Sequence, residues 1–188
     1  MSLRLHNSLS DQKEDFVPLR EGRVTLYVCG PTVYNDSHLG HAKTYVSFDV
    51  ILRYLKYRGF STFYVQNITD VGHLIGDADE GEDKMLKRAR ELELEPMAVA
   101  ETYTTRHFQA MDQMGVIRPD ICPRATGHIP GQLEAIEKMI EAGLAYEVNG
   151  SVYFDVSKDP EYGNLSNRSF EEMQEGARVE VRQEKRNP

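Results

Sequence analysis

The sequence has 188 residues, of which 40% are hydrophobic and 28% charged, proportions typical of a soluble globular domain. The 30 acidic residues outnumber the 22 basic ones, and the formal net charge of −8 argues against a dedicated nucleic-acid-binding module. Two cysteines exclude a disulfide framework, the apolar runs are too short to cross a membrane, and no secretion signal opens the chain. We therefore expect a cytoplasmic protein with no membrane partner.

The first regular elements predict a strand–helix–strand unit. Residues 23–28 (RVTLYV) are rich in β-formers and end at a Gly-Pro turn. In residues 40–58 apolar side chains recur at helical spacing, and Gly59 is a suitable terminator. Residues 61–66 (STFYVQ) again have strand character and lead into a loop at 67–70. Because such a unit implies parallel strands, the sequence predicts an α/β fold.

The rest of the chain predicts helices and one hairpin. We expect helices at 79–94 and 97–114 with a proline between them, a helix at 129–142, and strands at 144–148 and 151–156. The turn between these strands is Asn149-Gly150, a strong short hairpin signal.

A proline-rich segment at 118–123 suggests a division between residues 1–120 and residues 121–188. Residues 1–120 contain only one predicted strand–helix–strand unit, whereas a doubly wound sheet needs more strands. We therefore expect the chain to be a piece of a longer protein.

The residues that suggest chemistry lie where the first strand passes into the first helix. His38 and His41 are three apart at the helix start, so both can point toward one ligand. This end of a helix carries unpaired N–H groups and the positive end of the macrodipole, which suits phosphate. Gly40 leaves room for a nucleotide to lie against the backbone. The segment also follows the carboxyl end of a strand, where open α/β sheets bind ligands.

Here the chain resembles the class I aminoacyl-tRNA synthetases, and the cysteinyl members in particular. The sequence HLGH at 38–41 is similar to their HIGH signature, and YVCGPTVY at 27–34 is similar to the cysteinyl enzymes. The similarity continues at 64–71 (YVQNITDV), 124–126 (RAT), 143–155 and 162–166 (YGNLS), and so covers nearly the whole chain.

The resemblance implies an enzyme that activates L-cysteine with ATP and Mg²⁺ and transfers it to tRNA(Cys). Residues 1–120 would be the first half of a Rossmann-like nucleotide-binding domain with parallel strands, and residues 121–188 part of an α+β insertion (connective) domain. His38 and His41 would be catalytic. The ATP or adenylate site would be lined by Gly30, Thr32, His38, Gly40, His41, Asn67 and Thr69.

The resemblance also makes Cys29 the first ligand of a Zn²⁺ ion that accepts the substrate thiolate, since soft sulfur outcompetes oxygen there. The other zinc ligands, the KMSKS loop and the anticodon-binding region are not among these 188 residues. We therefore expect the chain alone to be inactive in aminoacylation and weak or incapable in zinc binding. We expect the full-length enzyme to be a monomer.

Other interpretations stay open. A cysteine:glucosaminyl-inositol ligase would form the same adenylate but transfer cysteine to an amine, and the segment CGPTVY favours the synthetase. A truncated, non-catalytic paralogue would also lack the later motifs, and the sequence downstream would distinguish it. A metal hydrolase that uses His38 and His41 lacks a third ligand at suitable spacing.

Several polar residues have ordinary structural explanations. Asn67 and Thr69 could be turn formers, although we favour a place in the adenylate pocket. The acidic run 77–83 is interpreted as a solvated loop, because it lacks the spacing of a calcium site. We assign a structural place to Cys122 and no role to His73, His107 and His128.

Overall fold

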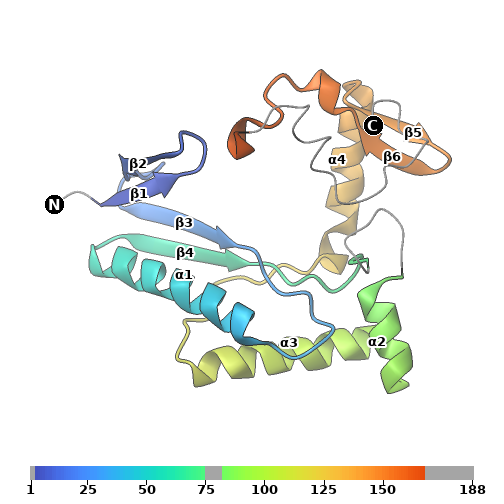
Figure 1. Cartoon of the computed structure of the whole chain (residues 1–188), viewed down its shortest axis with the longest axis horizontal. Helices are drawn as coiled ribbons and strands as arrows, with labels where there is room; N and C mark the ends of the chain where they lie inside the picture. The colour runs from blue at the N-terminus through green and yellow to red at the C-terminus, as the bar shows by residue number, and fades with distance from the viewer. Residues whose placement is uncertain (1–2, 75–81, 168–188) are drawn as a thin grey trace. The chain divides into compact units, whose positions relative to one another are not determined.

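The computed structural model describes residues 3–74 and 82–167, which belong to two compact units (Figure 1). The central unit comprises Pro18–His128, and the terminal unit joins Met1–Val17 to Ile129–Pro188. The units thus separate after His128. The expected division at residue 120, which concerns domains of the parent protein, stays a prediction.

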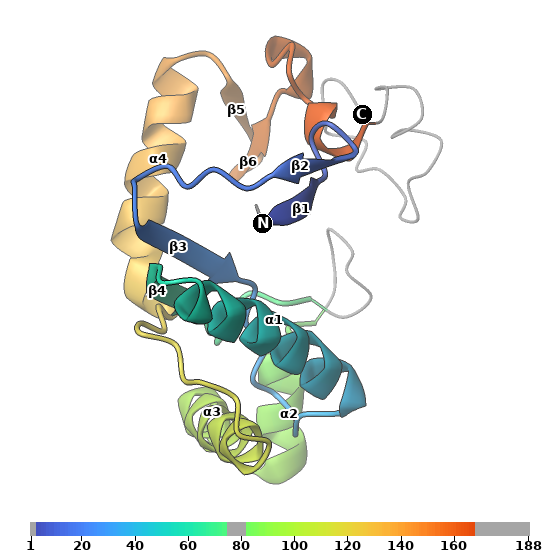
Figure 2. The same ribbon diagram turned by 90° about the vertical axis from the view of Figure 1, so that its left-hand side faces the viewer.

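The centre of the central unit is the predicted parallel strand pair. Strands β3 (Arg23–Val28) and β4 (Ser61–Gln66) pair over their whole length, from Arg23 opposite Ser61 to Val28 opposite Gln66. Helix α1 (Leu39–Tyr57) connects them, and in Figures 1 and 2 it lies along one side of the pair. Both strands have the predicted bounds, and the helix differs from prediction by one residue at each end.

The proline-rich segment 118–123 is hydrogen-bonded to the end of β4 and to the loop that follows it. The Gln66 N–H donates to the Ile121 carbonyl at 3.2 Å, and the Ile68 N–H donates to the Pro123 carbonyl at 2.8 Å. The segment therefore lies beside the end of β4, and it ties the loop after β4 to the residues that follow helix α3 (Pro96–Gln113).

Two helices precede this segment, as predicted. Helix α2 (Lys84–Leu92) begins later than expected, because the Asp83 carboxylate accepts the N–H groups of Met85 and Leu86 and so caps the helix. Residues 79–81 of the expected helix lie outside the described residues. Pro96 does separate the two helices, and it does so as the first residue of α3, where its missing N–H costs nothing.

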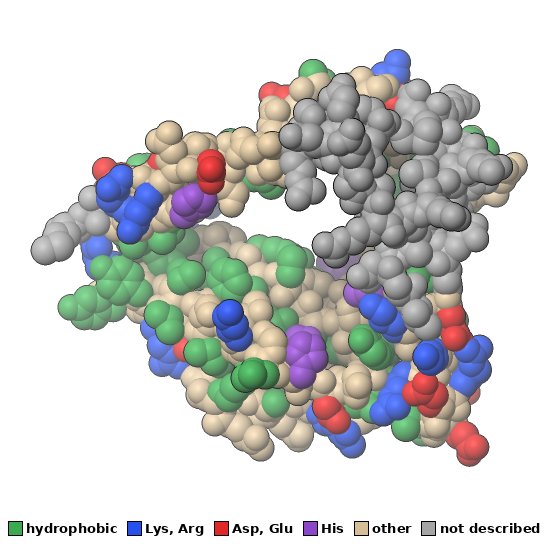
Figure 3. Space-filling model, viewed as in Figure 1, with side chains coloured by type: hydrophobic (Ala, Val, Ile, Leu, Met, Phe, Trp, Pro, Cys, Tyr) green, Lys and Arg blue, Asp and Glu red, His purple; other side chains and the backbone are tan. Residues whose placement is uncertain are grey.

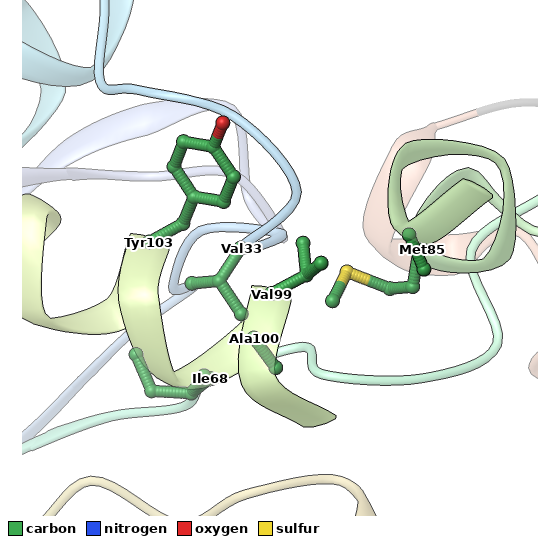
Figure 4. Close-up of a cluster of buried hydrophobic side chains, with 7 residues drawn as sticks. Val33, Ile68, Met85, Val99, Ala100 and Tyr103 are labelled. Atoms are coloured by element: carbon green, nitrogen blue, oxygen red, sulfur yellow. The ribbon is translucent and has the colours of Figure 1, made fainter. Parts of the chain in front are cut away.

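Two groups of buried side chains hold the central unit together. One joins the loops after β3 and β4 to α2 and α3 (Figure 4) and contains Val33, Ile68, Met85, Ala89, Val99, Ala100 and Tyr103. The other joins the two strands to α1 and α3 and contains Val28, Tyr45, Leu52, Tyr64 and Met111. The site-bearing loops therefore rest directly on packed helices. The solvent side of α1 carries apolar side chains, which are visible in Figure 3.

The terminal unit contains two hairpins and a helix. Strands β1 (Arg4–Asn7) and β2 (Gln12–Asp15) form an antiparallel hairpin that the sequence patterns did not predict. Helix α4 (Ile129–Glu141) and the pair β5 (Ala145–Val148) and β6 (Ser151–Phe154) confirm the predicted order.

The turn of the second hairpin has the backbone that its residues suggest. Asn149 and Gly150 have φ values of 51° and 79°, which an Asn-Gly pair adopts readily. The second strand stops at Phe154, two residues early, because the Asp155 carboxylate caps a short 3₁₀ turn (Val156–Lys158). One further 3₁₀ turn, Asn164–Ser166, follows. Within the described ranges, none of the helices combines the length and apolarity needed to cross a membrane.

Candidate active site

Cys29 directly follows strand β3 and is exposed at the carboxyl end of the strand. Val28, the last strand residue, is buried in the core, whereas Cys29 is exposed. The hydroxyl of Tyr45, on helix α1, donates to the Cys29 carbonyl at 3.2 Å. This bond fixes the backbone at Cys29 against the helix and leaves the residue accessible. Cys29 can therefore act as a sulfur ligand.

Asn67 holds the turn that follows Cys29. Its Oδ1 accepts the Gly30 N–H at 2.7 Å and the Tyr27 hydroxyl at 2.9 Å, and its Nδ2 donates to Thr69 Oγ1 at 3.1 Å. A Cβ added to Gly30 would lie 1.5 Å from the Asn67 carbonyl oxygen, so only glycine allows the two backbones to approach this closely. Asn67 thus shapes the loop from within.

The loops after β3 and β4 remain side by side beyond the strands. The Thr69 N–H donates to the Pro31 carbonyl at 3.0 Å, and the Val33 N–H donates to the Thr69 carbonyl at 3.2 Å. Thr32 and Thr69 are consequently opposite each other. The Thr32 hydroxyl is also hydrogen-bonded to His73 Nδ1 at 2.7 Å. The structure therefore brings together Gly30, Thr32, Asn67 and Thr69, and their place in an adenylate site stays a prediction.

The two histidines cap the start of α1 together. His38 Nδ1 accepts the Gly40 N–H at 3.0 Å, and His41 Nδ1 accepts the His38 N–H at 3.1 Å. The ring centroids are 4.0 Å apart. Because each ring accepts at Nδ1, its neutral form carries the proton on Nε2. The pair therefore presents two Nε2–H donors at the positive end of the helix dipole.

Gly40 makes this arrangement possible. A Cβ at this position would lie 2.8 Å from His38 Cε1 and 3.0 Å from its Nδ1. The sequence predicted room for a nucleotide next to Gly40, and in this structure the His38 ring lies there. The glycine between the histidines therefore allows the imidazole to fold over the helix start.

The electrostatics of the helix start favour an anion. Burial lowers the pKa of His41, and the charge of His38 lowers it further, so His41 is neutral at neutral pH. The first turn of α1 contains no acidic residue that would repel a phosphate. Imidazole N–H donors at the positive end of a helix dipole are a suitable setting for phosphate oxygens.

The sequence interpretation missed three contributors to the site. Tyr45 anchors Cys29 and stacks on His41 with 6.5 Å between ring centroids. His73 bonds to Thr32, and His107, on α3, lies behind the His38–His41 pair. A helical spacing of four between His41 and Tyr45 was a usable signal. Nothing in the sequence indicates that His107 lies near the others.

The described residues include one exposed thiol, that of Cys29. No group of three or more His, Cys, Asp or Glu side chains in the described part of the chain is arranged to hold a metal ion. Cys122 packs against the first buried group, and burial raises its pKa. Among the described residues, Cys29 could therefore supply no more than one ligand of a metal site. The acidic run 77–83 lies mostly outside the described residues.

Comparison with known proteins gives consistent similarities. A model of the tRNA synthetases class I (C) catalytic domain matches residues 15–188. Proteins named cysteine–tRNA ligase are 56% identical in Chlorobaculum tepidum and 54% identical in Thermus thermophilus, each over 100% of this chain. The chain spans 39% of the length of either relative.

One solved structure shares the fold at low identity. The LeuRS of Agrobacterium radiobacter, in a ternary complex with tRNA and LeuAMS, has a TM-score of 0.54 and 20% identity, over 70% of this chain and 16% of that one. Its similarity supports the α/β fold with a parallel sheet. The family match over residues 15–188 shows that the chain belongs to the class I (C) tRNA synthetase catalytic domains.

Proposed function

We propose that this chain is the first part of an enzyme that activates L-cysteine with ATP and transfers it to tRNA(Cys). The observation that carries the proposal is the convergence of Cys29 and the His38–His41 pair on one buried tyrosine, Tyr45. A thiol that can hold a metal and two donors that suit phosphate thereby lie at one end of the sheet. The insertion-domain assignment of residues 121–188 remains part of this proposal.

The proposed chemistry is attack of the cysteine carboxylate on the α-phosphorus of ATP, which expels pyrophosphate. Negative charge accumulates on the phosphorus oxygens, so fixed donors lower the barrier. The Nε2–H groups of His38 and His41 would donate hydrogen bonds to these oxygens, assisted by the start of α1. The Thr32 and Thr69 loops would line the adenylate pocket, with Asn67 holding them in register with Gly30. Mg²⁺ would accompany ATP.

Selection of cysteine would depend on Cys29. A zinc ion bound there would favour a thiolate over the hydroxyl of serine. Within this chain, Cys29 would hold the ion, and the Tyr45 hydrogen bond would keep the Cys29 backbone in place. Completing the site requires ligands beyond the described residues.

The test for this function uses the full-length protein that contains this segment. We expect cysteine-dependent ATP–pyrophosphate exchange. His41→Ala should slow exchange about 100-fold, the cost of removing one preorganised donor, and leave tRNA(Cys) affinity unchanged. His6→Ala, at an exposed position in β1, serves as the matched control and should retain wild-type exchange. Loss of tRNA binding with intact exchange would contradict the assignment.

A second variant tests the cysteine site. Cys29→Ser should remove bound zinc and selectivity against serine, whereas Cys122→Ala should preserve both. Selectivity that survives Cys29→Ser would refute the proposed ligand. Adenylate formation followed by transfer to an amino sugar, with no charging of tRNA(Cys), would favour the glucosaminyl-inositol ligase.

A further inference from the structure

A row of buried polar side chains lies behind the candidate site. Tyr45 is 3% exposed, Gln66 is 3% exposed and His107 is 2% exposed. They come from α1, β4 and α3, so the row crosses the central unit. Gln66 and His107 have no place in the proposed chemistry. Buried polar groups are costly unless their hydrogen bonds are satisfied, which raises the question of what this row does.

The direction of the hydrogen bonds is fixed at the Cys29 end. A carbonyl oxygen can only accept, so the Tyr45 hydroxyl must donate to the Cys29 carbonyl. Burial raises the pKa of Tyr45 to about 12, so the hydroxyl keeps its proton at neutral pH. The Tyr45 ring also packs edge-on against the His107 ring.

The orientation of Gln66 then determines the tautomer of His107. Gln66 Oε1 accepts the Tyr64 hydroxyl at 3.0 Å, and its Nε2 lies 3.4 Å from His107 Nε2. An amide NH₂ group only donates, so His107 Nε2 must lack a proton. Burial, together with the charges of His41 and Arg118, lowers the pKa of His107 to about 4, so the ring is neutral at neutral pH.

A neutral ring with a bare Nε2 carries its proton on Nδ1. That nitrogen lies 2.9 Å from Ser37 Oγ, so His107 donates to the serine. Ser37 immediately precedes His38, the N-cap residue of α1. Through the Tyr45–His107 ring contact and the His107–Ser37 hydrogen bond, the row connects the Cys29 carbonyl to the residue that leads into the histidine pair.

We propose that His107, as its Nδ1–H tautomer, is a positioning residue that fixes the start of α1, and with it the His38–His41 pair, relative to Cys29. The assignment rests on the proposed function. His107 also contacts the ring of Tyr45 edge-on, with 5.1 Å between centroids, and that of His41 at 6.5 Å. A displacement of His107 would therefore affect both Tyr45, which is bonded to Cys29, and the ring of His41.

The kinetic test compares three variants of the full-length protein in ATP–pyrophosphate exchange. His107→Phe keeps an aromatic ring but removes both hydrogen bonds, and it should lower kcat/KM about 100-fold, as small misplacements of reacting groups do. His107→Asn places an amide N–H where Nδ1–H was and should recover most of the loss. Met111→Ala loosens the same core but removes none of the row's hydrogen bonds, so it controls for reduced stability.

The spectroscopic test reads the tautomer directly. In full-length protein labelled with ¹⁵N-histidine, the ring signals that disappear in His107→Phe should show a protonated Nδ1 and a bare Nε2, unchanged around neutral pH. A protonated Nε2, or exchange activity that falls equally in Met111→Ala and His107→Phe, would overturn the positioning role. Wild-type protein with no exchange would overturn the proposed function, and the role with it.

Discussion

Acid should destabilise the chain through His107. Burial, then the nearby charges of His41 and Arg118, lowers the pKa of His107 from 6.5 to about 4. Between these values the unfolded chain binds a proton that the folded chain does not. The contribution of the neutral His107 ring to the unfolding free energy is therefore complete above about pH 6.5 and is lost as the pH falls toward about 4. A gap of this size corresponds to about 3 kcal/mol of unfolding free energy.

The assay is urea denaturation followed by far-UV circular dichroism, from about pH 7 down to about pH 4. His107→Asn lacks the titrating ring. The difference in unfolding free energy between the wild type and His107→Asn should therefore change by about 3 kcal/mol in favour of the variant over this range. Only the wild type has an imidazole that is neutral in the folded chain and protonated in the unfolded chain. His6→Asn, at an exposed position, should give a profile parallel to the wild type. Parallel profiles for His107→Asn and the wild type would refute the reasoning.

Two further substitutions probe the loops that carry the site. Gly30→Ala should destabilise the chain by about 3 kcal/mol, because its Cβ would collide with the Asn67 backbone, whereas Gly127→Ala meets nothing within 4 Å and should be nearly neutral in the same urea titration. Asp70 is 3% exposed and accepts hydrogen bonds from the backbone and hydroxyl of one threonine at 3.0 and 2.6 Å. Asp70→Asn should cost about 2 kcal/mol, and Asp36→Asn, which weakens only an exposed ion pair, should cost under about 0.5 kcal/mol; equal losses would contradict the burial argument.

Local sequence patterns predicted the elements that are regular over their own length. Strands 23–28 and 61–66 alternate buried and exposed side chains, and the helix between them repeats apolar residues at helical spacing. The hairpin at 4–15 escaped prediction because its strands are short and mostly exposed, so burial leaves no pattern in them. The start of α2 shifted because a single carboxylate, Asp83, decides it.

The site residues fall into the same two groups: those that local sequence can place and those that only the packing of the fold brings together. His38, His41 and Cys29 could be placed because the strand end and helix start that carry them are adjacent in sequence. His107 is 70 residues from Ser37, and only the packing of α3 brings it to the helix start. Asn67 was placed near the pocket, but its bonds to Gly30 and Tyr27 depend on strand register, which a sequence does not reveal.

The protonation pattern limits what the histidine pair can do. Both Nδ1 atoms accept backbone N–H groups, and burial lowers the pKa of His41, so this ring is not a ready proton donor to a leaving group at neutral pH. A neutral Nε2–H can still donate a hydrogen bond without transferring its proton. Expulsion of pyrophosphate needs no proton on the departing oxygen if that charge is stabilised elsewhere. In the proposed function, His41 would therefore bind charge as it develops, with no acid–base step from its imidazole.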